Sequence, residues 1–107
     1  MELVLNGNKI VPINSYNRDT VFASDGSIAS NAYVNFTPTA TTMNTLHEFA
    51  SGGITQLYIR PDAQSAPVYR LDNIDAHLVS MNENIYDGGM NCTLSMSFNL
   101  NGSQPSN

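Results

Sequence analysis

The chain has 107 residues, which suits one domain with a modest hydrophobic core. Its net charge is −5, and charged residues make up only 12% of the chain. The basic residues are Lys9, Arg18, Arg60 and Arg70. Four scattered cations cannot form the positive track that phosphate groups require, so composition argues against nucleic acid and anionic membranes as partners.

The amino-terminal residues and the single cysteine indicate a cellular compartment. Residues 1–7 lack the basic start and the apolar run of a signal peptide. No apolar stretch approaches the ~20 residues of a membrane-spanning helix. Cys92 is the only cysteine, so no disulfide can form within the chain. We therefore expect a protein that is made and folded in a reducing cytoplasm.

The first predicted element is a β-hairpin. Two β-prone runs, residues 2–5 and 9–13, flank Asn6-Gly7, a pair typical of tight turns. Pro12 has no N–H to donate, which makes the second run an edge strand. A polar break over residues 14–17 is expected to follow.

Two strands and a helix are predicted next. The strands cover residues 19–24 and 32–37, with a loop beginning at Asp25-Gly26. The helix runs from about Thr42 to Ser51. Its apolar residues Met43, Leu46, Phe49 and Ala50 recur at helical spacing. Thr41 or Thr42 is expected to cap its start, and Gly52-Gly53 to end it.

The third quarter of the chain predicts further strands. Residues 54–60 read as a strand and residues 61–67 as a loop. Residues 68–71 and 74–81 are either two strands or one strand with an irregularity near Asp72-Asn73. Turns are expected at 82–84 and 87–89.

The clearest pattern is the alternation that ends the domain. From Met90 to Leu100 the apolar residues are Met90, Cys92, Leu94, Met96, Phe98 and Leu100, and every residue between them is polar and uncharged. A period of two places all six on one face of a strand, with a neutral polar strip on the other. Residues 101–107 are polar and without pattern, so we expect a single domain over 1–100 and a disordered tail over 101–107.

These elements predict an all-β or β-dominated fold. We expect a β-sandwich or small barrel of six to eight strands, with one short flanking helix. The core is predicted to run through Val34, Phe36, Leu46, Phe49, Leu57, Ile59, Leu78, Leu94, Met96 and Phe98.

Each residue that carries chemistry also has a structural interpretation. His47, beside Glu48, suggests a metal ligand or general base, but a polar helix face is the favoured explanation; His77 is expected on an exposed strand face. The oxygen-rich group Asp72, Asn73 and Asp75 lacks the converging loop ligands of a calcium site.

No spacing in the sequence identifies a general base for Cys92, which is therefore expected to be a small buried hydrophobe rather than a nucleophile. Phosphate-binding glycine patterns and the Gly-x-Ser-x-Gly element are absent from the sequence. We therefore predict no catalytic, cofactor-binding or metal-binding residues, no cofactor, and a protein that is not an enzyme.

The stretch from about Thr42 to Leu100 resembles a known class. It contains a helix ending at Gly52-Gly53, then Ile54-Thr-Gln-Leu-Tyr-Ile-Arg-Pro61, then Tyr69-Arg-Leu-Asp-Asn-Ile-Asp-Ala-His-Leu-Val79 and the alternating strand. This order resembles small β-rich structural proteins of tailed bacteriophages and prophages, of the tail-tube, tail-completion or baseplate type. The resemblance implies a β-sandwich or barrel with one flanking helix, assembled into rings.

The functional expectation is a structural protein that acts by self-association, as a tail or baseplate subunit of a phage or prophage particle. Its partners would be further copies of itself in a ring and other virion proteins, first in the host cytoplasm and then in the virion. The alternative is a monomeric binding module, for example for carbohydrate. The five tyrosines that keep this alternative open are Tyr16, Tyr33, Tyr58, Tyr69 and Tyr86.

Overall fold

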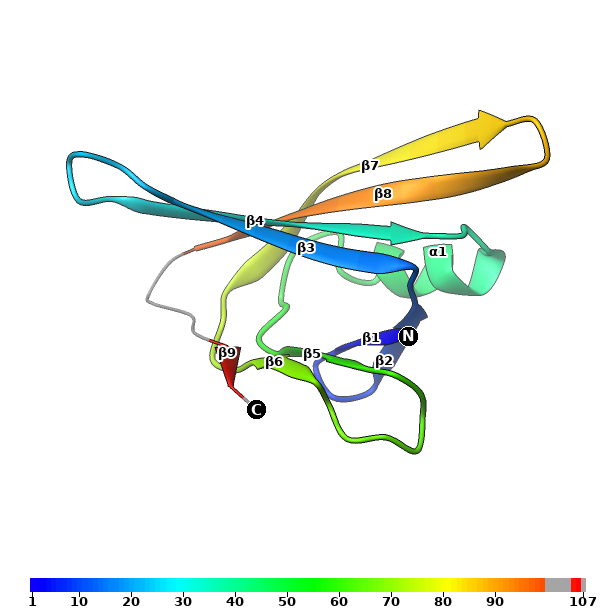
Figure 1. The fold of residues 1–107 in the computed structure, drawn as a ribbon, viewed down its shortest axis with the longest axis horizontal. Helices are drawn as coiled ribbons and strands as arrows, with labels where there is room; N and C mark the ends of the chain where they lie inside the picture. Colours follow the sequence, from blue (N-terminus) through cyan, green and yellow to red (C-terminus); the bar gives the residue numbers. More distant parts are fainter. Residues whose placement is uncertain (100–104, 107) are drawn as a thin grey trace.

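The chain folds into a sandwich of two antiparallel β-sheets with one short helix (Figure 1). The structure is a computed structural model that describes residues 1–99 and 105–106. The sheets lie face to face, and neither closes into a barrel within these residues. The predicted β-dominated fold is confirmed, in its sandwich form. Most of the predicted tail over 101–107 lies outside the described residues.

The first sheet has the strand order β2-β1-β5-β6-β9. Its strands are β1 (Glu2–Leu5), β2 (Lys9–Pro12), β5 (Leu57–Arg60), β6 (Tyr69–Leu71) and the two-residue β9 (Pro105–Ser106). The predicted amino-terminal hairpin is confirmed. Pro12 lies on the edge strand, as its missing N–H requires.

The turn of that hairpin depends on two residues in the left-handed region. Asn6 has φ 53° and Gly7 has φ 81°, values that asparagine and glycine tolerate best. The side chain of Asn6 also accepts hydrogen bonds from the N–H groups of Thr55 and Gln56 and donates to the carbonyl of Gly53. One residue thus joins the turn to the segment that leads into β5.

The second sheet has the order β3-β4-β8-β7 and is made of two long hairpins. Its strands are β3 (Ser15–Phe22), β4 (Ile28–Phe36), β7 (Ala76–Tyr86) and β8 (Gly89–Phe98). The polar break predicted at 14–17 is wrong, because β3 begins at Ser15 and Tyr16 packs against the core. β4 likewise begins at Ile28, four residues before the prediction.

β7 corrects two further expectations. The turn predicted at 82–84 is wrong, because these residues pair with β8 in a ladder that continues to Tyr86 opposite Gly89. The turn itself is Asp87-Gly88. β6 and β7 belong to different sheets, and Asn73, with φ 55°, lies where the chain crosses between them. The single irregular strand is therefore excluded.

β8 carries the predicted alternation. Cys92, Leu94, Met96 and Phe98 are buried, and the polar residues between them are half-buried. Met90 shares their face but is exposed, because the hairpin continues past the end of the other sheet. Leu100 lies outside the described residues.

The helix α1 (Ala40–His47) begins two residues earlier and ends four residues earlier than predicted. Its cap is Thr39, whose hydroxyl accepts a hydrogen bond from the N–H of Thr42. The expected caps Thr41 and Thr42 lie inside the helix. The chain then continues in turns before Gly52 and Gly53, both at positive φ, lead it towards β5.

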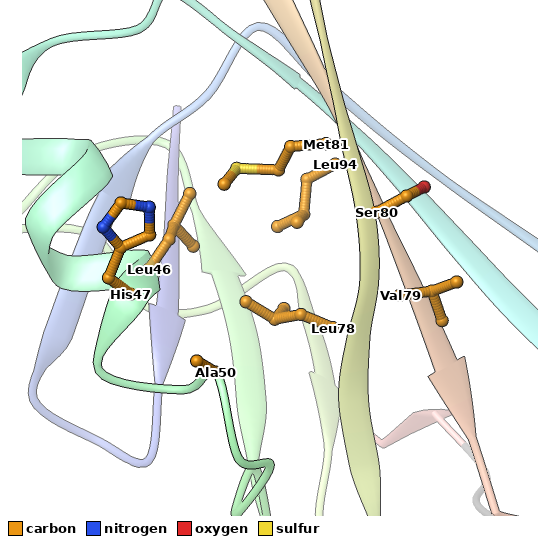
Figure 2. A pocket seen from close by; sticks show the side chains of 8 residues that line it. All are labelled: Leu46, His47, Ala50, Leu78, Val79, Ser80, Met81 and Leu94. Atoms are coloured by element: carbon orange, nitrogen blue, oxygen red, sulfur yellow. The ribbon is translucent and has the colours of Figure 1, made fainter.

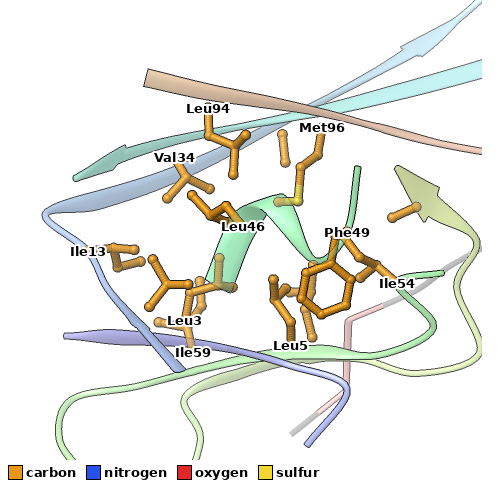
Figure 3. Packing of buried hydrophobic residues seen from close by; sticks show 14 of the residues in the cluster. Leu3, Leu5, Ile13, Val34, Leu46, Phe49, Ile54, Ile59, Leu94 and Met96 are labelled. Carbon is orange, nitrogen blue, oxygen red and sulfur yellow. The ribbon is translucent and has the colours of Figure 1, made fainter. Parts of the chain in front are cut away.

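The core lies between the two sheets and takes one face of the helix. Figure 3 shows Leu46 between Val34 and Leu94 of one sheet and Leu3 of the other. Every predicted core residue is buried except Leu78, which is half-buried against the core. The core also includes residues that the sequence did not single out: Leu3, Leu5, Val11, Ile13, Ile54, Leu71, Ile74 and Ala76.

Candidate interaction surface

Two hairpins extend past the sandwich at opposite ends of the molecule (Figure 1). We call residues 19–29 the β3–β4 arm and residues 82–90 the β7–β8 arm. Every residue in both arms is exposed. The arms exist because β3, β4, β7 and β8 are longer than the strands of the first sheet, so their outer halves have no facing layer.

The β3–β4 arm ends in apolar side chains on a well-bonded turn. Phe22 is 76% exposed, and Val21 and Ile28 are exposed beside it. The Oδ1 atom of Asp25 accepts bonds from both the N–H and the hydroxyl of Ser27, at 2.9 and 2.7 Å. The hydroxyl bond chiefly lowers the pKa of Asp25. These bonds stabilise the turn between the two strands that carry the exposed apolar residues.

The β7–β8 arm repeats this composition at the other end. Ile85 is 78% exposed, and Tyr86 and Met90 are exposed next to it. Gly88 has φ 97°, as its tight turn requires. A Cβ at Gly89 would lie 3.1 Å from the hydroxyl oxygen of Tyr86, so the tyrosine lies over this glycine. The two arms together present large apolar side chains to solvent.

Charge is distributed unevenly between the arms and the body. The arms contain Asp19, Asp25, Glu83 and Asp87 and no lysine or arginine. Ion pairs within the described body join Lys9 to Glu48, Arg60 to Glu2 and Arg70 to Asp72. Arg18, at the base of the β3–β4 arm, donates to Ser30 and lies 4.9 Å from the Phe98 ring centroid. The arms are thus apolar and acidic.

A small apolar cavity of about 180 Å³ lies between α1 and β7 (Figure 2). Leu46, His47 and Ala50 line one side of it, and Leu78, Met81 and Leu94 line the other. Val79 and Ser80 belong to the irregularity in β7, and Figure 2 shows their side chains turned away from the helix. Apart from His47 and Ser80, the lining residues are apolar, so the cavity offers mainly apolar contact.

The residues considered for chemistry are spread over the fold, and Asp72 and Asp75 form hydrogen bonds with neighbouring side chains. His47 is exposed at the end of α1, and His77 is half-buried on β7, opposite Ser97. Asp72 accepts hydrogen bonds from Gln56 and Arg70, and Asp75 accepts one from Asn99. Across the described residues, no three His, Cys, Asp or Glu side chains lie close enough together to hold a metal ion.

Cys92 is fully buried on the inner face of β8, which confirms its predicted position. Burial raises the pKa of its thiol. The side chain packs among apolar residues as a small hydrophobe, and a neutral thiol is a poor nucleophile.

The five tyrosines lie on five different strands. They are Tyr16 on β3, Tyr33 on β4, Tyr58 on β5, Tyr69 on β6 and Tyr86 on β7. Tyr16 and Tyr69 pack on each other across the sheets, with ring centroids 5.2 Å apart. Arg60 covers the Tyr58 ring at 5.9 Å. This dispersal gives no support to a shared aromatic platform of the kind that binds sugars.

The fold and surface define a β-sandwich with two projecting, apolar hairpin arms. The chain matches no protein-family model and no curated protein. None of its described helices has the length and apolar character needed to cross a membrane. Sequence reasoning missed the arms, although one signal was present: apolar residues at 21, 22 and 85 stand directly beside turn residues.

Proposed function

We propose that this protein is a structural subunit that acts by self-association, as part of the tail or baseplate of a phage or prophage particle. In this role it would stay in the host cytoplasm until it joined the virion. The observation that carries the proposal is the pair of arms at opposite ends of the sandwich, each with exposed apolar residues.

Exposed apolar residues at the tips of ordered hairpins favour an interaction role. Phe22 and Ile85 contribute almost nothing to the core, since about three-quarters of each side chain remains in solvent at 76% and 78% exposure. Contiguous exposed apolar surface of this kind marks interaction sites in soluble proteins. Arms at opposite ends suit head-to-tail contacts, which produce rings when the rotation closes.

The small size of the hydrophobic core also supports self-association. A domain of this length buries a limited core, so contact with further copies adds stability that the monomer lacks. The monomeric binding module finds less support, because the tyrosines are dispersed and the cavity beside α1 is small.

Size-exclusion chromatography with light scattering, from micromolar to near-millimolar protein, tests the proposal. We expect the mean mass to rise with concentration towards a discrete multiple of 11.6 kDa. A strict monomer at every concentration, which also fails to join any particle when co-expressed with neighbouring tail or capsid genes, would contradict it.

A further inference from the structure

We propose that β3 of one copy pairs, antiparallel, with β7 of the next copy, with Arg18 opposite Glu83. This inference rests on the proposed self-association and names its contact. It continues the four-stranded sheet from subunit to subunit. The occupant of each open edge is therefore a second copy of this chain.

The two sheets differ in whether their edge strands are protected from pairing with another chain. In the first sheet, Pro12 on β2 blunts one edge, and β9 covers the outer side of β6 at the other. In the second sheet the edge strands β3 and β7 have 8 and 11 residues, and neither has a strand on its outer side in the described part of the chain. Long open edges are templates for pairing with another chain, and proteins normally protect them.

Strand direction permits pairing between the two unlike edges. Every neighbouring pair in the order β3-β4-β8-β7 is antiparallel, so β3 and β7 run in opposite directions. A β7 placed beside β3 of another copy, with its sheet facing the same way, is therefore antiparallel to it. The arms extend from opposite ends, so a neighbour shifted along the strands brings its β7–β8 arm against the first half of β3, and the β3–β4 arm lies against the middle of its β7.

The irregularity in β7 limits the register. The ladder with β8 shifts between Leu78 and Ser80, so the longer regular part of β7 runs from Ser80 to Tyr86. That regular length is close to the 8 residues of β3. A neighbouring β3 can pair with this part of β7 from Ser15 opposite Tyr86 to Val21 opposite Ser80, and Phe22 then falls at the irregularity.

The face of the sheet on which each side chain lies further restricts which residues of β3 and β7 can be opposite each other. Tyr16 packs against the core and Arg18 lies over Phe98, so both turn to the inner face of the sheet. Met81 packs against the core, and alternation places Glu83 on the same face, opposite Cys92 of β8. Residues directly opposite in a ladder share a face, so only alternate registers keep these faces continuous.

Among the face-matched registers, one pairs the charges. With Arg18 opposite Glu83, Tyr16 falls opposite Ile85, and Asp19 falls opposite Asn82. Opposite charges attract across the interface, no like charges face each other, and the exposed Ile85 gains an aromatic neighbour. In the single subunit the guanidinium of Arg18 turns towards Ser30 and the Phe98 ring, so pairing with Glu83 requires it to exchange these contacts for the neighbour's carboxylate.

Charge exchange tests the contact. R18E and E83R each place like charges across the interface and should weaken self-association about tenfold or more. Mixing the two variants restores opposite charges at every contact, as does the double variant R18E/E83R. The controls K9E and E48R make the same charge changes at surface residues of the body, outside the pairing and outside the arms. Light scattering gives the association constant, and circular dichroism with thermal melting verifies folding.

Covalent trapping gives an independent measurement. It does not use R18E, so a loss of stability in that variant does not affect it. Asn17 and Asn84 are exposed and fall opposite each other in the same register. The variant N17C/N84C/C92S should oxidise to a ladder of covalent multimers, because each copy contributes both edges. Each single-cysteine variant should give no more than slow, collisional dimers.

The outcomes separate this contact from the proposed function. Association restored in the mixture, together with a multimer ladder, supports the pairing. Wild-type association that the folded variants leave unchanged, or that neither mixing nor the double variant restores, overturns the contact while the assembly function stands. If E83R weakens association and R18E does not, the copies pair through β7 against β7, and the proposed β3–β7 contact is also overturned. A wild type that never associates overturns the proposed function itself.

Discussion

At the scale of single residues, identical side chains have opposite roles according to position. Phe98 is 3% exposed at the end of β8, where Arg18 covers its ring, whereas Phe22 lies in solvent on the β3–β4 arm. The sequence placed Phe98 in the core by alternation. It gave no reason to separate Phe22 from a core residue, because exposure depends on whether a facing layer exists.

Phe98→Ala should lower the free energy of unfolding by about 3–5 kcal/mol, because it removes a buried ring and leaves a cavity. Urea denaturation at low protein concentration measures this change. The matched control Phe22→Ala should change the free energy of unfolding by less than about 0.5 kcal/mol. Similar losses in the two variants would contradict the assignment of the arm as solvent-exposed.

The buried hydroxyl of Tyr16 leads us to expect that the stability of the fold decreases at high pH. Its hydroxyl oxygen is buried without a hydrogen-bond partner among the described residues, and burial raises its pKa above the ordinary value of 10.0. The folded state therefore holds the proton more tightly than the unfolded state. This contribution to stability is complete below pH 10 and is lost as the pH rises above it.

Tyr16→Phe tests that dependence directly. The variant should be no less stable than wild type at pH 7, because it removes a buried hydroxyl without changing the ring packing against Tyr69. Thermal melts between pH 8 and 11 should show a smaller loss of stability in the variant. An equal loss in both proteins would mean that another group causes it.

At the scale of elements, local pattern and tertiary context agree in some segments and differ in others. The hairpin β1–β2 and the strand β8 follow from turn chemistry and alternation. β7 does not, because Asn82-Glu83-Asn84 has the composition of a turn and yet pairs with β8 throughout. An exposed hairpin tolerates these polar residues, since its ladder hydrogen bonds do not depend on side-chain type.

Asn6→Ala tests how firmly the first hairpin is attached to the rest of its sheet. The substitution removes bonds to Thr55, Gln56 and Gly53 and places alanine in a left-handed conformation. We expect a loss of about 2 kcal/mol in the free energy of unfolding. Asn8→Ala, in the same turn, should cost less than about 0.5 kcal/mol in the same denaturation experiment.

At the scale of the whole molecule, the arms should contribute to association rather than to folding. Replacing residues 85–90 by Asn-Gly joins Asn84 to Asn91, which already face each other, and removes Ile85, Tyr86 and Met90. The free energy of unfolding should change by about 1 kcal/mol or less, because the deleted side chains are exposed.

The same shortened protein should self-associate more weakly than wild type in light-scattering experiments. Circular dichroism should report an unchanged sandwich. Unfolding of the shortened protein would show that the β7–β8 arm belongs to the core structure, and undiminished association would show that this arm is not part of the interface.

Net charge gives a last prediction at this scale. Each copy carries a charge of −5, so copies repel one another at low ionic strength. Raising the salt concentration from about 10 to 150 mM shortens the Debye length from about 30 to 8 Å and should strengthen association. Weaker association over this range would mean that attraction between opposite charges outweighs the overall repulsion.

The sequence by itself determined the β-dominated class, the amino-terminal hairpin with its edge strand, the final strand and most of the core. These depend on turn residues and on periodicity, which act within a few neighbours along the chain. The burial of Cys92 followed from the same alternation, and the predicted core positions on β4, β5 and β8 are all buried.

Only the tertiary structure decided which sheet each strand joins, where β3 and β4 begin, and how far the hairpins extend past the sandwich. Two runs as similar as β6 and β7 enter different sheets because Asn73 redirects the chain between them. The arms and the open edges of β3 and β7 depend on where facing layers end. That limit is set by contacts between residues far apart in the chain, and no local pattern contains it.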